Sequence, residues 1–170
     1  MIAAAVFLIL PLCLAIAAFS DLFTMTIPNR VSLILVASFL LLAPLSGLSL
    51  EAIGMHLVAA AIVFGACFAL FAFNVMGGGD AKLLSATALW FGLNQSLAFL
   101  MTDVAAVGGL VTLLILLVRT QANTILAIGL PVPISLLLAK KIPYGIAIAI
   151  GGFMAFPSSP LFLVALESLK

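Results

Sequence analysis

Charged side chains are scarce in this sequence. Only 6% of its 170 residues are Asp, Glu, Lys or Arg, whereas ordinary globular chains contain about 25%. Hydrophobic residues make up 66% of the chain, and a water-soluble fold of this length could not bury so much apolar surface. Because these residues come in runs, and a helix needs about 20 of them to cross a bilayer, lipid is the expected solvent for most of the chain.

The sequence also lacks an excess of either charge and has few cysteines. Six Lys or Arg stand against five Asp or Glu, a net charge of +1, so we expect no nucleic-acid partner. Cys13 and Cys67 lie inside apolar runs, with no second Cys or His at ligand spacing. We therefore predict no metal site, no disulfide and no cofactor, and we interpret both cysteines as small packing residues.

The apolar stretch at the start lacks the features of a signal peptide. Residues 2–19 have no positive n-region, and Asp21 follows them instead of a small-residue cleavage site. We interpret this stretch as a retained first span. The whole chain, residues 1–170, is expected to form one integral-membrane domain.

Hydrophobic runs separated by charge, proline and glycine predict about six membrane helices. Backbone polar groups must be satisfied inside lipid, and a helix satisfies them within one segment. The predicted fold class is therefore all-α, a polytopic bundle of antiparallel helices. These helices are expected at residues 2–19, 31–45, 52–73, 81–91, 97–118 and 144–166. The turn after the short fourth helix is predicted at 92–96; a turn at Thr102 and Asp103 is the alternative and would lengthen that helix.

Segment 120–143 interrupts this pattern. Its apolar part, 124–139, contains Gly129, Pro131 and Pro133, and proline breaks a helix interior. We predict a cytoplasmic or re-entrant segment between the fifth and sixth helices. If it spanned the membrane instead, the last helix would have the opposite orientation.

Positive charge indicates which face of the membrane is cytoplasmic. With six crossings, the basic residues before the C-terminal Lys170 all fall on one side: Arg30, Lys82, Arg119, Lys140 and Lys141. The opposite connections contain Glu51 but no Lys or Arg. By the positive-inside rule, the basic side is the cytoplasm and both termini face outward.

Two aspartates are expected at the cytoplasmic ends of helices. Asp21 follows the first helix, and Asp80 precedes the fourth. An antiparallel bundle brings both to one membrane face, where they could be neighbours. Two adjacent carboxyl groups share a proton and titrate as a unit. One can then take a proton from water while the other polarises a scissile carbonyl, which is the chemistry of peptide hydrolysis by an aspartate pair.

The residues around both aspartates fit such a site. Glycines without side chains would let the backbone approach an extended substrate closely. Three of them directly precede Asp80: Gly77, Gly78 and Gly79. After Asp21, the string Ile-Pro-Asn ending in Pro28 and Asn29 would set a fixed turn into the second helix, since proline suits the first helical turn.

Other interpretations of the two carboxylates stay open at this point. Asp80 is also a suitable N-cap for the fourth helix, and Asp21 could be solvated among lipid headgroups. Because buried membrane carboxylates often mark ion paths, a small ion- or proton-coupled transporter is the alternative function. Such a transporter predicts carboxylates near the bilayer midplane and an inverted repeat, and the sequence shows no repeat.

The remaining polar residues have more than one interpretation. Lys82 either tunes the aspartate pair or contacts a leader or lipid phosphate, or it anchors the helix as a positive-inside residue. His56 is expected near the outer end of the third helix, across the membrane from the pair. Asp103 is a third acidic candidate, but it lacks glycine neighbours before it, and we do not expect it to be catalytic. Trp90 and Tyr144 are aromatic residues of the kind found at membrane interfaces.

Three strings, in order along the chain, together resemble the type IV prepilin peptidase family of GxGD aspartyl proteases. They are Asp21 followed by Ile-Pro-Asn at 27–29, Gly-Gly-Gly-Asp-Ala-Lys-Leu-Leu at 77–84, and Pro-Tyr-Gly at 143–145. The resemblance implies an intramembrane aspartyl endopeptidase with Asp21 and Asp80 as its catalytic pair and Tyr144 lining the site. It also implies prepilin and pseudopilin substrates, whose basic leader is cleaved at the cytoplasmic face of a bacterial inner membrane.

Larger members of this family carry an N-terminal methyltransferase region with paired Cys-x-x-Cys motifs. This sequence contains no such motif. It is therefore similar to the short, peptidase-only form associated with tight-adherence (Flp) pili. That similarity implies Flp-type prepilins as substrates and no methyltransferase domain.

Overall fold

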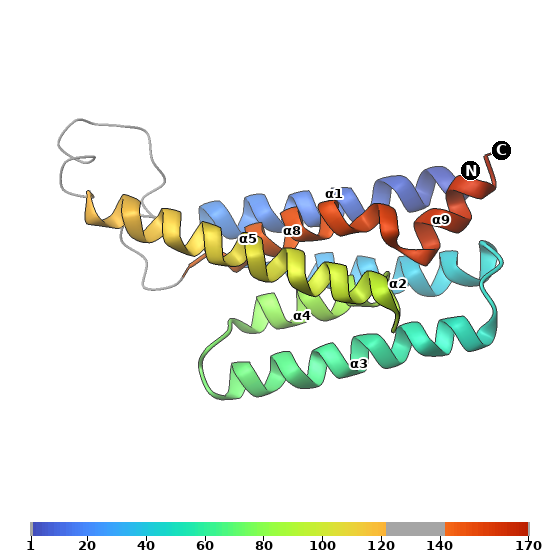
Figure 1. The fold of residues 1–170 in the computed structure, drawn as a ribbon, viewed down its shortest axis with the longest axis horizontal. Helices are drawn as coiled ribbons and strands as arrows, with labels where there is room; N and C mark the ends of the chain where they lie inside the picture. The colour runs from blue at the N-terminus through green and yellow to red at the C-terminus, as the bar shows by residue number, and fades with distance from the viewer. Residues whose placement is uncertain (1, 122–141, 170) are drawn as a thin grey trace.

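The computed structural model describes residues 2–121 and 142–169, and within these ranges the only secondary structure is helical. The long helices run roughly along one axis, and the start of α1 and the end of α9 lie at the same end of the bundle (Figure 1). The helices in chain order are α1 (Ile2–Thr24), α2 (Asn29–Leu45), α3 (Leu50–Ala72), α4 (Gly78–Ala88), α5 (Gln95–Thr120), α8 (Tyr144–Ala155), the 3-10 turn η1 (Phe156–Ser158) and α9 (Pro160–Glu167).

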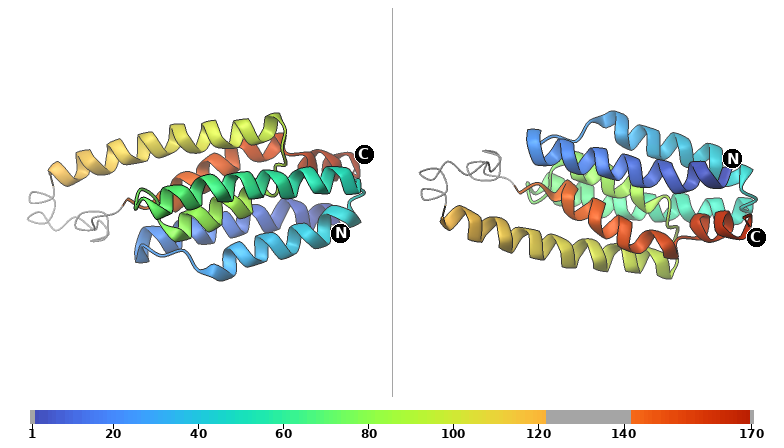
Figure 2. Two further views of the ribbon diagram at one scale, coloured as in Figure 1. Left: turned by 90° about the horizontal axis from the view of Figure 1, so that it is seen from below. Right: turned by 90° about the horizontal axis from the view of Figure 1, so that it is seen from above.

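The packing order of the helices differs from their chain order. The largest contacts join α5 to α8, α1 to α8 and α3 to α4, whereas α2 packs on α1 and α4 and barely contacts α3. Figure 2 shows α2 and α5 at opposite edges of the bundle, with α1 and α8 between them. The end of α1, the end of α3 and the start of α4 therefore meet at one end of the bundle.

Within the described ranges, three helices are long and apolar enough to cross a membrane: α1, α3 and α5. The bent pair of α8 with η1 and α9, which turns by 48°, is a candidate for a fourth span. α2 with 17 residues and α4 with 11 are shorter than a full span. Large hydrophobic side chains such as Leu33, Leu41 and Phe68 face outward, as expected for a surface covered by lipid.

The all-α prediction is confirmed, and helices occupy each of the six predicted stretches. That all six cross the membrane stays a prediction. α5 begins at Gln95, so the turn predicted at 92–96 is confirmed and the alternative at Thr102 and Asp103 is wrong. Both of those residues lie inside α5. Segment 124–139, Lys140 and Lys141 lie outside the described residues.

Two helix ends near the aspartates differ from the prediction. α1 continues to Thr24, so Asp21 lies in its last turn and not after it. The helix ends where Met25 adopts a left-handed φ of 54°. α4 already begins at Gly78, and its N-cap is Gly77. The interpretation of Asp80 as the N-cap is therefore wrong, because Asp80 lies inside the first turn.

The last predicted helix, 144–166, is interrupted. Residues Phe156–Ser158 form a 3-10 turn before α9 begins at Pro160. Proline lacks an N–H group and clashes with the preceding helical turn, so Pro157 and Pro160 explain a break that hydrophobicity alone did not indicate.

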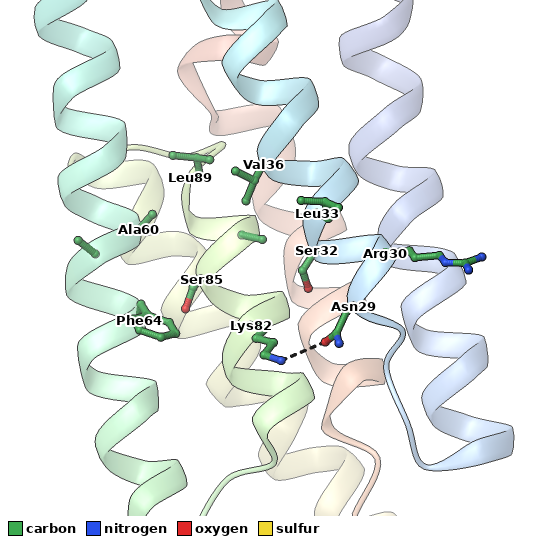
Figure 3. A pocket seen from close by; sticks show the side chains of 12 residues that line it. Asn29, Arg30, Ser32, Leu33, Val36, Ala60, Phe64, Lys82, Ser85 and Leu89 are labelled. Atoms are coloured by element: carbon green, nitrogen blue, oxygen red, sulfur yellow. Dashed lines mark hydrogen bonds between the residues drawn. The ribbon is translucent and has the colours of Figure 1, made fainter.

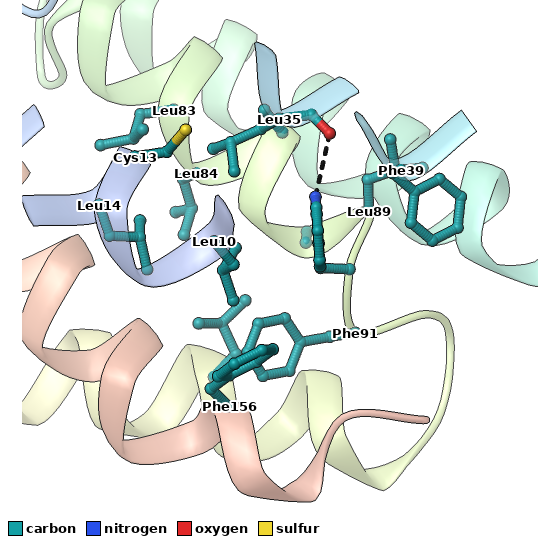
Figure 4. Packing of buried hydrophobic residues seen from close by; sticks show 14 of the residues in the cluster. Leu10, Cys13, Leu14, Leu35, Phe39, Leu83, Leu84, Leu89, Phe91 and Phe156 are labelled. Atoms are coloured by element: carbon teal, nitrogen blue, oxygen red, sulfur yellow. Dashed lines mark hydrogen bonds between the residues drawn. The ribbon is translucent and has the colours of Figure 1, made fainter. Parts of the chain in front are cut away.

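The connection between α4 and α5 starts inside the bundle: residues 89–92 are buried, whereas Leu93 and Asn94 are exposed. Trp90, expected at a membrane interface, is instead 0% exposed, and its Nε1 donates to the Leu35 carbonyl oxygen at 3.0 Å (Figure 4). His56 does lie near the start of α3, where it is buried with Nδ1 at 2.7 Å from the Leu89 carbonyl oxygen. Its ring stacks on Phe39. These contacts fasten the end of α4 to α2 and α3.

Candidate active site

Asp21 is held from two sides. It lies in the last turn of α1 and is only 6% exposed. Its Oδ2 accepts a hydrogen bond of 2.7 Å from the backbone N–H of Gly145, at the start of α8. A side chain at position 145 would meet this carboxyl, since an alanine Cβ would lie 2.9 Å from the same oxygen. The close approach of α8 therefore fixes the orientation of the Asp21 carboxyl group.

The turn after Asp21 is held by hydroxyl groups. Ser20 Oγ donates to the Thr26 carbonyl oxygen at 2.8 Å, and the hydroxyls of Thr24 and Thr26 lie 2.7 Å apart. Thr24 Oγ1 also donates to the Ser20 carbonyl oxygen at 2.7 Å. These bonds hold the turn that follows α1 and fold the chain back towards Pro28 and α2.

Asp80 folds back over the start of its own helix. An alanine Cβ at Gly77, the N-cap of α4, would lie 2.7 Å from Asp80 Oδ2. The N-terminus of a helix carries partial positive charge and favours a negative side chain there. Asp80 is half-buried, so its carboxyl group is both anchored at the helix start and accessible.

Both aspartates line one cavity of about 250 Å³, here called the aspartate cavity. It is also lined by Met25, Thr26, Ile27, Asn29, Gly77, Gly78, Gly79 and Ile142. The end of α1, the turn into α2, the start of α4 and the chain before α8 all meet there. Side chains far apart in the sequence thus share one small space.

The three glycines make this convergence possible, each in a different way. At Gly77, the space that a Cβ would need is taken by the Asp80 carboxyl group. A Cβ at Gly78 would lie 3.2 Å from the Phe71 ring, and a Cβ at Gly79 would lie 3.2 Å from Ile27 Cβ. The glycines admit other parts of the chain at close range, and all three also line the aspartate cavity. That they also admit an extended substrate stays a prediction.

A second cavity of about 410 Å³, here called the side cavity, is also lined by Asp80. Asp80, Gly77 and Ile142 line both cavities. The rest of its wall comes from Leu70, Phe71, Asn74, Val75, Met76 and Tyr144. Tyr144 therefore lies on the Asp80 side, and it also packs closely on Gly108 of α5, where an alanine Cβ would come within 2.7 Å of its hydroxyl.

The start of α2 is connected to α4 beside the aspartate cavity. Pro28 is exposed and adopts the extended conformation that precedes a helix. Asn29 lines the cavity, and its Oδ1 accepts a 3.1 Å hydrogen bond from Lys82 Nζ (Figure 3). Lys82 itself does not line the aspartate cavity. It connects two helices that border it.

Sequence reasoning missed several residues of this site. Gly145 belongs to the Pro-Tyr-Gly string, but nothing in the sequence indicates that its backbone amide binds Asp21. The left-handed Met25 and the packing of Ile27 on Gly79 carry no signal in composition or periodicity. Asp103, the third acidic candidate, lines neither of these two cavities and lies along α5.

The fold and the site together define a polytopic helical membrane protein with two carboxyl groups around one cavity at an end of its bundle. A family model of the type IV leader peptidase family matches residues 8–128. This is most of the chain, and the chain therefore belongs to that family. It is a membrane-embedded aspartyl peptidase with prepilin-like substrates. No curated protein and no solved structure matches the chain significantly.

Proposed function

We propose that Asp21 and Asp80 are the catalytic pair of this peptidase, and that it removes the leader from Flp-type prepilins at the cytoplasmic face of the bacterial inner membrane. The single observation that carries the proposal is the aspartate cavity, which both carboxyl groups line. Such a pair shares one proton because two like charges at close range are costly.

The surroundings of the two carboxyl groups suggest different roles. The N-terminus of α4 favours the negative charge on Asp80, which leaves the shared proton on Asp21. Oδ2 of Asp21 accepts from the Gly145 amide, so this proton is on Oδ1. Asp80 would then act as the general base and Asp21 as the general acid.

The hydrolysis follows from these roles. Asp80 takes a proton from a water molecule while the water oxygen attacks the scissile carbonyl carbon, and Asp21 gives its proton to the carbonyl oxygen. When the tetrahedral intermediate collapses, the C–N bond breaks and the leaving amine takes the proton from Asp80. The hydroxyl proton of the intermediate returns to Asp21, which restores the pair.

The substrate chain would pass Asp80 between the two cavities. One side of the scissile bond would lie in the aspartate cavity, with Asn29 and the glycine backbone as polar neighbours. The other side would occupy the side cavity, whose wall of Leu70, Phe71 and Val75 suits an apolar side chain. Tyr144 would support the substrate there.

The orientation and the substrate type rest on separate arguments. Arg30, Lys82 and Arg119 all belong to helix ends on the aspartate side of the bundle, and a basic face is the cytoplasmic one. The Flp-type substrate follows from likeness to the short, peptidase-only form. N-methylation is not part of the proposed activity.

The test is cleavage of a purified Flp-type prepilin by the protein in liposomes. Asp21→Asn and Asp80→Asn, made separately, are each expected to lower the cleavage rate by about 10²–10⁴-fold, the usual contribution of a general acid or base. Asp103→Asn is the matched control and should cleave at the wild-type rate. Full cleavage by either pair variant would exclude that residue from the chemistry.

Substrate type is tested with the same preparation. Prepilins of another type IV class should be cleaved more slowly than the Flp-type prepilin at equal concentration. Equal rates would contradict the proposed preference for Flp-type prepilins, but they would not contradict the catalytic role of the aspartate pair.

A further inference from the structure

A further groove, which shares only Asn29 with the aspartate cavity, opens on the side of the bundle between α2 and α3. It has a volume of about 630 Å³. The two helices barely contact each other, and α4 lies behind them as the floor (Figure 3). Leu33 and Val36 form one wall, and Ala60 and Phe64 form the other, with Leu89 on the floor. The body of the groove is therefore apolar.

The end of the groove nearest the aspartate cavity is cationic. Lys82, Arg30 and Asn29 line it. In Figure 3, Lys82 points across the opening to Asn29, whereas the Arg30 side chain leaves α2 in the direction away from Lys82. Within the described residues, no Asp or Glu lines the groove. The hydrogen bond to Asn29 uses one of the three donors of an ammonium group, so Lys82 can bind a further acceptor.

We propose that this groove binds one anionic phospholipid, with its phosphate at Lys82 and one acyl chain between α2 and α3. An apolar channel with basic side chains at one end matches the two parts of such a molecule. The cytoplasmic leaflet carries anionic lipids, and basic pockets between membrane helices bind their headgroups. The proposal rests on the proposed orientation of the chain, but it does not require the aspartates to be catalytic.

Charge distinguishes this occupant from an uncharged one. A neutral lipid or an apolar peptide segment would fill the body of the groove equally well, but neither would gain from the charge of Lys82. A phosphate accepts charge-assisted hydrogen bonds from Lys and Arg. Preference for an anionic headgroup is therefore the property to be measured.

The single tryptophan of the chain is a suitable reporter. Trp90 follows Leu89 on the groove floor and is bonded to Leu35 of α2, the helix that forms one wall. In phosphatidylcholine vesicles, increasing fractions of chain-brominated phosphatidylglycerol should quench Trp90 fluorescence and reach saturation at a low fraction. Brominated phosphatidylcholine should quench only in proportion to its fraction. Equal quenching by both lipids would overturn the proposal.

Variants locate the binding to the groove. Lys82→Met should lower the preference for phosphatidylglycerol by about fivefold, as expected for one basic residue near an anionic lipid. Arg119→Gln, which removes a basic residue at the end of α5, is the matched control and should keep the preference. If both variants lost it equally, the effect would be general surface attraction and the proposal would fail.

A second pair of variants tests the apolar body. Ala61→Phe should block the groove and remove the saturable quenching. Ala66→Phe adds the same ring to an exposed position of α3 outside the groove and should not. Quenching without lipid preference that is relieved by added prepilin would assign the groove to the substrate and overturn the proposal. Asp80→Asn should bind the lipid like the wild type. Lipid binding and prepilin cleavage are therefore tested independently, and one proposal can fail while the other stands.

Discussion

The backbone N–H of Gly145 donates to Oδ2 of Asp21 at 2.7 Å, across 124 positions of the sequence. The bond joins the first turn of α8 to the last turn of α1. It uses one carboxyl oxygen and directs the other one away from α8. The geometry at Asp21 thus depends on how α8 begins.

We expect Gly145→Ala to reduce cleavage strongly while the bundle still folds. The new Cβ would lie 2.9 Å from Asp21 Oδ2 and 3.1 Å from Ile27 Cδ1, so α8 or the carboxyl group must shift. A misplacement of about 1 Å can cost about 10²-fold in rate. Prepilin cleavage and thermal unfolding should be measured together. Gly109→Ala, in open space on α5, is the control; wild-type cleavage by Gly145→Ala would show that α8 does not position Asp21.

The glycines before Asp80 should differ in sensitivity. Alanine at Gly77 meets the Asp80 carboxyl at 2.7 Å, and alanine at Gly79 meets Ile27, including its backbone N at 3.6 Å. Alanine at Gly78 meets only the Phe71 ring, which is exposed and can move. The loss of cleavage rate should therefore be smallest for Gly78→Ala, larger for Gly79→Ala and largest for Gly77→Ala, which should cleave about 10²-fold more slowly than the wild type. Gly65→Ala, with nothing within 4 Å, should cleave normally, and the reverse order would contradict this packing.

The Lys82 and Asn29 side chains should be energetically coupled. An exposed hydrogen bond that involves a charge adds about 0.5–1.5 kcal/mol to the unfolding free energy. A double-mutant cycle of Lys82→Met and Asn29→Ala, measured by thermal or denaturant unfolding in detergent, should give a coupling of that size. Additive effects of the two changes would mean that the 3.1 Å contact does not hold α2 to α4.

The turn between α4 and α5, away from the aspartate cavity, should affect stability without changing the chemistry. Gly92 has a φ of 72°, and an alanine Cβ there would lie 2.8 Å from the His56 ring. Gly92→Ala should destabilise the protein by the left-handed cost of about 1–2 kcal/mol plus about 1–3 kcal/mol for overpacking.

Gly47→Ala separates these two contributions. Gly47 has a φ of 88°, but an added Cβ there would have no neighbour within 4 Å. Alanine at this position should therefore lower the unfolding free energy only by the cost of the left-handed backbone conformation. Cleavage per folded molecule should be unchanged in both variants. Equal destabilisation by the two substitutions would show that the His56 ring moves aside without a measurable loss of unfolding free energy.

The sequence allowed the order of the helices to be predicted because lipid imposes long apolar runs, and these are visible in composition. The helix ends were less predictable: Pro157 and Pro160 break the last helix, and α1 continues past Asp21 until the left-handed Met25 ends it. Trp90 was misjudged because aromatic character suggests an interface, whereas its position was decided by a turn that folds into the core.

For the candidate site, the motif strings identified the residue types, but not their contacts. Asp21, Asp80, Asn29 and the glycines all line the aspartate cavity. The Gly145 bond and the packing of Ile27 on Gly79 depend on tertiary approach of segments that no local pattern connects. Lys82, two residues from Asp80, lines the groove and not the aspartate cavity because successive helical positions face different directions.

The shortness of α4 has a consequence for the surrounding bilayer. Its 11 residues rise only about 16 Å, roughly half of the hydrocarbon thickness of about 30 Å. If Asp80 lies at one surface, the loop that follows the helix is at mid-depth, where irregular backbone must be shielded from acyl tails. Leu89, Trp90 and Phe91 keep the first part of this loop inside the bundle, being at most 2% exposed, whereas Leu93 and Asn94 are exposed. Substitutions that uncover this loop would therefore fail at insertion or assembly, before any question of turnover arises.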